Sequence, residues 1–590
     1  MTTVPSEVRL SGPGQLTGAP SRVGTLRRGR RLRLNGGFAA MSLVTIVVAF
    51  LVLFPLAMLV FGSFWTARPG FPGTLTLDNY VRAYTDPDTY RIFSTTVLLI
   101  GAKTLVAVTF AAALAWIVTR TDTPFRGTLE VLLTVPFFIP GLLEAIGWIM
   151  LLSPNTGTIN VWLKALLGLP DAPLNIYSLG GMIWVMSLGS TSFIFLLLVN
   201  ALRNMDASLE ESARASGAGP VRTAVTVTLP LVAPVILGAG MLSFIRAMDS
   251  FEVPVLLGMP AKVFVFSNRI YAAIQYDYPV NYGLATALGV SFFALIGLLI
   301  FAQSRILHGK QFFVITGKGY QPRIVRLGNF RYVTLGVCLL YFVIGTGLPL
   351  SQVFVGSFLR VFGLPRWDLF TLANYGAILA DATLWRGLVN TFVVCGAAAL
   401  ATVLLCTMIA YITTRTTYVG RKTLNVISWL PWAIPGIVAG VGMLWAYITL
   451  PVRLYGTLAL VMIVLLTTGL PLGVRLMSGV MVQLGMELEE SSRVHGASWQ
   501  YTFRHILTPL LKPALAGAFL LLFVNFSRAV STTILFVGPG TELLAVSLFS
   551  YSQAGKYEIV SALAIVLMLI NVSGLVVARR LGAFGEAARF

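Results

Sequence analysis

The chain has 590 residues, of which 56% are hydrophobic and only 11% charged, and its 42 Lys and Arg outnumber its 22 Asp and Glu to give a formal charge of +20. Soluble domains carry about 25% charged residues, so this composition excludes an array of soluble domains and indicates a protein that crosses a membrane many times. The three cysteines all lie in apolar stretches, so no disulfide framework is expected.

Residues 1–34 end in a basic run from Arg27 to Arg33. We expect a disordered cytoplasmic tail followed by an uncleaved first span, because the first apolar run is longer than the core of a signal peptide. A span needs about 20 apolar residues. Twelve such runs predict an all-α membrane protein with about twelve transmembrane helices, at residues 38–64, 92–119, 129–152, 180–202, 229–252, 282–304, 332–358, 387–414, 424–450, 455–475, 510–535 and 559–578.

Most of the excess positive charge falls between runs that share one side of the membrane when both termini are placed inside. Because Lys and Arg accumulate in cytoplasmic loops, this pattern predicts cytoplasmic termini. The charge is therefore explained by topology. We expect the lipid bilayer as a partner and no nucleic acid.

The second half of the chain repeats the first. Three short motifs recur 295 positions later, with Asn79 repeated as Asn374, Arg120 as Arg415 and Pro140 as Pro435. Beyond the fourth run the shift falls from 295 to 279, so the first half carries 16 extra residues, expected in the outer loop around residues 153–178. Six spans return the chain to the same side, which predicts two parallel six-helix repeats. We place them at 35–304 and 332–580, with a basic cytoplasmic linker at 305–331 and a cytoplasmic tail at 581–590.

The strongest repeated motif lies between the fourth and fifth spans of each half, in segments 208–230 and 487–509, which we call the repeated loops. Each pattern predicts a short helix, a glycine suited to a left-handed helix end, and a second helix that enters the fifth span. The residues that carry it are Glu211, Ala213, Gly217 and Pro230, and then Glu490, Gly496 and Pro509. An ordinary amphipathic loop helix is the alternative interpretation. The identical spacing in both loops favours a surface offered to a soluble partner.

The pattern Glu-x-Ala-x-x-x-Gly, followed by a hydrophobic-x-Leu-Pro, resembles the signature loop of binding-protein-dependent ABC importer permeases. Two positions of the second copy depart mildly from it, Ser492 in place of alanine and Thr508 in place of leucine. The resemblance extends over about residues 40–580. A fused two-copy permease of this length is most similar to the ferric-iron import group.

The resemblance implies a permease subunit that forms the translocation pathway for a small solute delivered by an extracytoplasmic binding protein, with ferric iron as the expected solute. It also implies that two copies of an ABC ATPase subunit bind the repeated loops on the cytoplasmic side of a bacterial inner membrane. Thiamine, aminoethylphosphonate and polyamines are the alternative solutes.

The chain shows no catalytic motif of its own. A phosphate-binding loop needs Gly-Lys followed by Ser or Thr, and none of the three Gly-Lys pairs is followed by either residue. We therefore expect no enzyme activity and no bound cofactor in this chain, with ATP used by the partner subunit. Three histidines outside the predicted spans offer no metal site in them.

Ionisable residues in or near the spans are functional candidates, because each costs about 2.5–3.5 kcal/mol on insertion scales. The pathway or gate candidates are Glu144, Arg246, Asp249, Glu252 and Arg528, and Lys103 lies in another span. Arg246, Asp249 and Glu252 have a spacing that would let neighbours pair on one helix face. A self-paired structural cluster and a cargo contact therefore both remain open. Pro136, Pro140, Pro431 and Pro435 are predicted to bend the third spans.

Two other classes are weighed against the permease. A proton-coupled carrier also has two parallel six-span halves, but it typically carries a Gly/Asp/Arg loop after the second span, where this chain has Thr119–Arg126. A membrane-embedded enzyme would need a convergent catalytic set, and none is evident.

Overall fold

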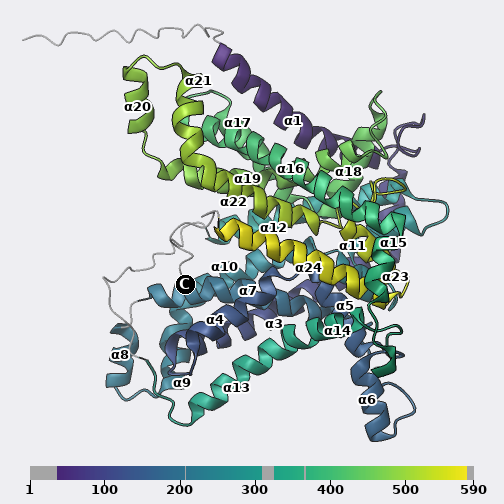
Figure 1. Ribbon diagram of the computed structural model, residues 1–590, viewed down its shortest axis with the longest axis vertical. Helices are drawn as coiled ribbons and strands as arrows, with labels where there is room; N and C mark the ends of the chain where they lie inside the picture. The colour runs from purple at the N-terminus through teal and green to yellow at the C-terminus, as the bar shows by residue number, and fades with distance from the viewer. Residues whose placement is uncertain (1–35, 206–207, 308–323, 364–366, 581–590) are drawn as a thin grey trace, which may run out of the picture.

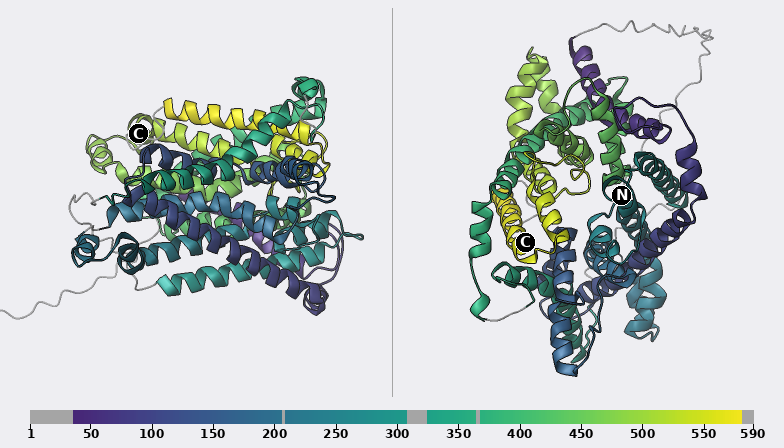
Figure 2. Two further views of the ribbon diagram at one scale, coloured as in Figure 1. Left: turned by 90° about the horizontal axis from the view of Figure 1, so that it is seen from below. Right: turned by 90° about the vertical axis from the view of Figure 1, so that its right-hand side faces the viewer.

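The computed structural model describes residues 36–205, 208–307, 324–363 and 367–580, and within these ranges the chain forms helices and no β-strand. The predicted tails, 1–34 and 581–590, and most of the predicted linker lie outside the described residues. The long helices run side by side in one general direction (Figures 1 and 2).

The helices follow the order of the two predicted halves. The first half contains α1 (Gly36–Ser63), α2 (Asp78–Thr85), α3 (Pro87–Arg120), α4 (Arg126–Thr134), η1 (Val135–Phe138), α5 (Gly141–Leu152), α6 (Thr158–Leu167), α7 (Leu179–Asn204), α8 (Ser208–Ala215), α9 (Pro220–Thr223), η2 (Ala224–Thr228), α10 (Leu229–Met248), η3 (Pro254–Gly258), α11 (Phe266–Gln275) and α12 (Tyr282–Leu307). The second contains α13 (Phe330–Phe342), η4 (Val343–Gly347), α14 (Leu348–Ser357), η5 (Trp367–Leu369), α15 (Ala373–Ala380), α16 (Ala382–Arg415), α17 (Arg421–Trp429), η6 (Leu430–Ala433), α18 (Gly436–Thr449), α19 (Leu458–Gln483), α20 (Glu487–Val494), α21 (Trp499–Thr502), η7 (Phe503–Leu507), α22 (Thr508–Ser527), α23 (Leu544–Gln553) and α24 (Tyr557–Arg580).

The prediction of about twelve spans is confirmed. Among the described residues, ten helices are long and apolar enough to cross a membrane, and two bent helix pairs bring the number to twelve. Each bent pair is the third span of its half, with bends of 94° before α5 and 114° before α18. Ile139 and Ile434 are extended at these bends, because each precedes a proline (Pro140, Pro435) that disfavours helical backbone at the preceding residue.

The repeat is present in the helix boundaries themselves. Helices α3 and α16 begin and end 295 positions apart, and α7 through α10 lie 279 positions before α19 through α22. The 16 extra residues of the first half fall between α5 and α7, as predicted, and they include α6.

The two halves exchange their first helices. α1 of the first half packs on α18 of the second, and α14 of the second half packs on α5 of the first. Both crossings are close because a glycine faces a proline backbone. A Cβ at Gly442 would lie 2.7 Å from the Pro55 oxygen, and one at Gly147 would lie 2.7 Å from the Pro349 oxygen. The halves are therefore interlocked (Figure 1).

The predicted ends of the fifth and eleventh spans, residues 252 and 535, are wrong. α10 ends at Met248 and α22 ends at Ser527. Tertiary bonds take over after α10, since the Ser250 carbonyl accepts a hydrogen bond from Ser267 Oγ at 2.8 Å. Arg246, Asp249 and Glu252 therefore do not share one helix face.

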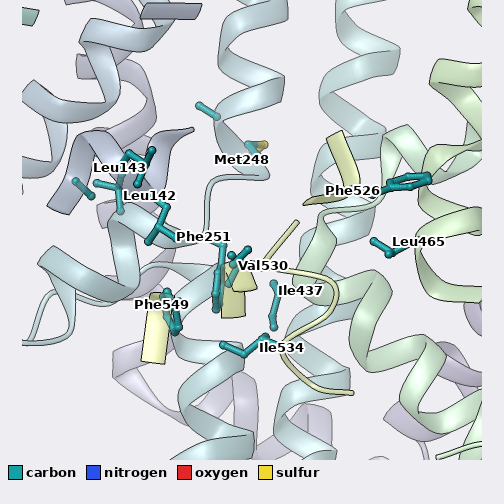
Figure 3. Packing of buried hydrophobic residues seen from close by; sticks show 14 of the residues in the cluster. Leu142, Leu143, Met248, Phe251, Ile437, Leu465, Phe526, Val530, Ile534 and Phe549 are labelled. Atoms are coloured by element: carbon teal, nitrogen blue, oxygen red, sulfur yellow. The ribbon is translucent and has the colours of Figure 1, made fainter. Parts of the chain in front are cut away.

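The segments that follow α10 and α22 meet at the boundary between the halves. Phe251 stacks on Phe549 of the second half with ring centroids 5.7 Å apart, and both side chains are fully buried. Ile437 and Ile534 lie beside this stack (Figure 3). The boundary is thus closed by apolar packing next to the residues that carry charge.

Candidate functional site

The repeated loops form the predicted helix–turn–helix at one end of the bundle (Figure 1). Gly217 and Gly496 follow α8 and α20 with φ of +87° and +78°. A Cβ at either glycine would meet nothing within 4 Å, so the left-handed backbone, and not a lack of space, is what favours glycine there. The two predicted helix-ending glycines are confirmed in this conformation.

The surface of each repeated loop combines acidic and apolar side chains. Glu490 is exposed, and Glu211 and Ala213 are half-buried. Leu209 and its counterpart Leu488 are each nearly half exposed. Pro230 and Pro509 are also exposed. Each follows a π-helical turn, η2 or η7, within a helix that continues unbroken into α10 or α22, and there proline removes one intrahelical N–H bond.

The neighbouring carboxylates Glu210 and Glu489 were not among the predicted site residues, yet these two are the carboxylates that are buried in the protein. Each is 3% exposed. Glu210 Oε1 lies 3.1 Å from Arg120 Nε, and Glu489 Oε1 lies 3.7 Å from Arg415 Nε. The repeat contained the signal for these pairs, because both arginines and both glutamates recur at the two constant shifts.

A cavity of about 280 Å³ lies in the first half between α5, α7 and the end of α10. The ionisable residues that line it are Lys103, Glu144, Arg246, Asp249 and Glu252. The structure thus brings together four of the five predicted pathway residues and Lys103. Arg528 is not among the lining residues. We call this space the charged cavity.

The cations of the charged cavity are held by neutral groups. Lys103 Nζ donates to Ser190 Oγ at 2.7 Å and to Ser243 Oγ at 3.2 Å. The Arg246 guanidinium lies over the Phe193 ring, 4.9 Å from its centroid. Within the described ranges no carboxylate oxygen lies within 4 Å of a nitrogen of Lys103 or Arg246. The interpretation of a self-paired cluster is therefore not supported at contact distance.

The carboxylates of the charged cavity have different surroundings. Asp249 Oδ1 accepts a hydrogen bond of 2.6 Å from the backbone N–H of Gly436, the first residue of α18 in the other half. Glu144 is 5% exposed, and its Oε1 has no hydrogen-bond partner among the residues described. A Cβ at Gly189 would lie 3.1 Å from Glu144 Oε2, so glycine at this position leaves room for the carboxylate.

The corresponding region of the second half lacks this set of charges. At the two shifts of the repeat, the counterparts of Lys103, Glu144, Arg246, Asp249 and Glu252 are Ala398, Ala439, Asn525, Arg528 and Ser531. An apolar pocket there is lined by Pro431, Ile434 and Ala439 together with residues of α1. The two halves share a backbone plan and differ in the chemistry that faces the centre.

No metal cage accompanies the cavity. In the part of the chain that the structure describes, no three His, Cys, Asp or Glu residues are grouped closely enough to hold a metal ion. The three carboxylates of the charged cavity therefore do not converge on one point.

The sequence pattern of the family described as "Binding-protein-dependent transport system inner membrane component" matches residues 104–311 and 403–583, once in each half. A ferric transport system permease protein of Actinobacillus pleuropneumoniae is 27% identical over 541 residues, covering 90% of this chain and 76% of the relative. A putative ferric transport system permease protein of Haemophilus influenzae is 28% identical over 514 residues, covering 86% of this chain and 78% of the relative. A spermidine/putrescine transport system permease protein of Escherichia coli is 28% identical over 283 residues, covering 45% of this chain and 98% of the relative.

Proposed function

The chain belongs to the family of binding-protein-dependent transport system inner membrane components, and from this premise we propose that it forms the pathway through which ferric iron is imported. Two copies of the family pattern in one chain make it a fused permease of an ABC importer, a transport component and not an enzyme. The choice of iron rests on the share of this chain that each relative matches. The ferric relatives match 86–90% of this chain, both halves included, whereas the polyamine relative matches 45%.

The charged cavity is the proposed point of passage, with Glu144, Arg246, Asp249, Glu252 and the nearby Arg528 as its contact or gate residues. Hard cations take oxygen ligands, and the cavity offers three carboxylates. Without a metal cage, iron is expected to pass with low affinity, so that selection rests with the extracytoplasmic binding protein. The bond from Gly436 N–H to Asp249 joins the two halves beside this cavity, which suits a gate that opens when the halves separate.

The repeated loops are the proposed contact with two copies of an ABC ATPase subunit. Their exposed leucines and carboxylates supply an apolar and acidic surface, one in each half. α1 begins and α24 ends at the same end of the bundle as α8 and α20 (Figure 1), which supports cytoplasmic termini in a bacterial inner membrane. ATP is then bound and hydrolysed by the partner, and this chain binds no cofactor.

Transport in proteoliposomes tests this function. The chain is reconstituted with an ABC ATPase subunit and a solute-binding protein from its own source, and ATP-dependent uptake of radioactive iron is compared with uptake of spermidine, thiamine and 2-aminoethylphosphonate. We expect uptake of ferric iron only. Uptake of one of the other solutes without iron would replace the solute and keep the permease class.

A further inference from the structure

Two matching helices, α3 and α16, are bonded at both ends to parts of the protein that lie on opposite sides of the bundle. At the end near the repeated loop of the first half, Arg120 Nε pairs with Glu210 of α8, and Arg120 Nη2 donates to the Leu202 carbonyl at 2.8 Å. Thr228, at the entry to α10, donates to the same Glu210 oxygen at 2.7 Å. The side chains of Arg120 and Glu210 are about 99% and 96% buried, respectively. This buried pair fixes α8 to the end of α3.

The second half repeats this connection with a longer contact between the arginine and the glutamate. Arg415 of α16 pairs with Glu489 of α20 and also donates to the carbonyls of Met481 and Leu484. Glu489 Oε2 accepts further bonds of 3.4 Å from Arg493 and from Tyr411. The same arrangement on the same helices in both halves indicates a shared role, although the Arg415–Glu489 contact, at 3.7 Å, is longer than the Arg120–Glu210 contact, at 3.1 Å.

Toward their opposite ends, at the tenth residue of each, α3 and α16 carry a second matching pair of bonds. Thr96 Oγ1 accepts from the backbone N–H of Phe266 at 3.2 Å, and Thr391 Oγ1 accepts from the N–H of Leu544 at 2.8 Å. Phe266 and Leu544 are the first residues of α11 and α23, whose first N–H groups have no partner within their own helix. Both threonines are buried. Each hydroxyl thus ties the start of a short helix to the neighbouring long one.

The helices between these ends are suited to move as units. Each has 34 residues, and neither contains proline beyond its first residue. Thr96 lies 24 positions from Arg120, as Thr391 does from Arg415, which is about 36 Å at 1.5 Å per residue and more than the hydrocarbon thickness of a bilayer. The third span of each half, by contrast, is broken at its centre.

We propose that α3 and α16, which we call the connecting helices, transmit movement of the repeated loops to α11 and α23 on the far side of the bundle. This inference rests on the proposed function, since it takes the repeated loops to be the contact with the ATPase. The arginine–glutamate pairs are the near attachments, and the threonine hydroxyls are the far ones. Arg120, Glu210, Thr96 and their counterparts are positioning residues in this scheme. α3 also carries Lys103, so the same movement reaches the charged cavity.

The test measures a distance on the far side of the complex between the chain and its ATPase subunits in nanodiscs. Spin labels are placed by Tyr276→Cys after α11 and Gln553→Cys at the end of α23. Both positions are exposed, and the three native cysteines are buried. The change in distance on ATP binding is then compared between the parent and the double variant Thr96→Val/Thr391→Val, which removes only the far hydroxyls. We expect the change in this distance on ATP binding to be smaller in the double variant than in the parent by about fivefold or more.

A second variant removes the near attachments and leaves no buried charge without its partner. It combines Arg120→Gln/Glu210→Gln with Arg415→Gln/Glu489→Gln. It should bind ATPase and nucleotide and also lose the distance change. The control is Glu130→Gln, which removes an ion pair between α4 and α7 at the same end of the bundle. Neither connecting helix takes part in this pair. Its distance change should equal that of the parent.

The outcomes separate the two proposals. A full distance change in the threonine variant, or none in an assembled parent, overturns the role of the connecting helices and leaves the permease function standing. Failure of the parent chain to assemble with any ATPase subunit overturns the proposed function as well.

Discussion

Adjacent glutamates in each repeated loop have opposite environments. Glu210 and Glu489 are buried against arginines, while Glu211 is half-buried and Glu490 is exposed. Successive residues of an α-helix point about 100° apart, so one carboxylate faces the protein when the next faces outward. The first of each pair therefore belongs to the interior of the permease, and the second is available to a partner.

This difference predicts unequal effects of two neighbouring substitutions. Glu210→Ala leaves Arg120 buried without its carboxylate, which costs about 3–5 kcal/mol of stability, whereas Glu211→Ala should change stability by about 0.5 kcal/mol or less. Thermal unfolding of the purified chain in detergent measures both. Equal losses would show that the buried pair does not contribute as its geometry indicates.

Asp249→Asn tests the charge that joins the halves. Asparagine keeps the size and an acceptor oxygen for Gly436 N–H but removes the negative charge. A charge-assisted hydrogen bond is worth about 1.5–3 kcal/mol, so we expect ATP-driven iron uptake to fall about tenfold or more while membrane abundance and ATPase assembly stay normal. Abundance that falls in step with uptake would make the residue structural. Arg246→Gln, on the same cavity, indicates by its relative severity whether the cargo passes as a cation or an anion.

At the scale of elements, helix ends and bends decide which side chains meet. Pro140 and Pro435 allowed the broken third spans to be predicted, and Gly217 and Gly496 allowed the repeated loops to be predicted, because proline and glycine act through local backbone geometry. The end of α10 was not predictable in this way. The spacing of Arg246, Asp249 and Glu252 is compatible with a helix that continues to residue 252, and the bond from Ser267 to the Ser250 carbonyl comes from a segment that only the fold brings near.

The turns of the repeated loops are the elements most sensitive to backbone change. Gly217→Pro or Gly496→Pro forbids the positive φ observed at both positions. We expect either variant to insert normally and to hydrolyse ATP with its partner while iron uptake is lost. Because the two halves are not identical, we expect the two variants to differ in severity. Normal uptake in both variants would contradict the role of these loops.

The crossings between the halves are a second test at this scale. Gly442→Ala and Gly147→Ala each place a methyl group 2.7 Å from a proline oxygen, and overpacking of this kind costs about 1–3 kcal/mol. Gly396→Ala in α16 is the matched control, because a Cβ there meets nothing within 4 Å. It should be neutral or stabilising by up to about 1 kcal/mol. Thermal unfolding of the three variants distinguishes these cases.

At the scale of the whole molecule, the sequence predicted the repeat, its two shifts and the number of spans, because each leaves a periodic trace. It did not predict that Lys103, Glu144 and Arg246 line one cavity, since they come from three different helices. Nor did it predict the exchange of α1 and α14, because Pro55 and Gly442 lie in different halves and carry no local sign of contact. The sequence showed that the two halves differ in chemistry, because the second half has Arg528 at the position that corresponds to Asp249. Only the fold showed that the charged residues of the first half line one cavity.

The absence of a phosphate-binding loop gives a prediction for the molecule as a whole. The isolated chain should show no ATP turnover above a detergent blank, and turnover should appear only when the ATPase subunits are added. A phosphate-release assay on the purified chain measures this. Sustained turnover by the chain alone, unchanged when contaminating ATPases are removed, would be incompatible with the proposed division of labour.

The exchange of first helices also sets an order for biosynthesis. α5 cannot receive its packing partner α14 until Pro349 has left the ribosome, about 200 residues after Gly147. At about 5–20 residues per second, α5 waits for roughly 10–40 seconds in the bilayer with an open flank that lipid or an insertion factor must cover. The first half therefore cannot mature before the second is made, and a chain truncated after α12 should be cleared by membrane quality control.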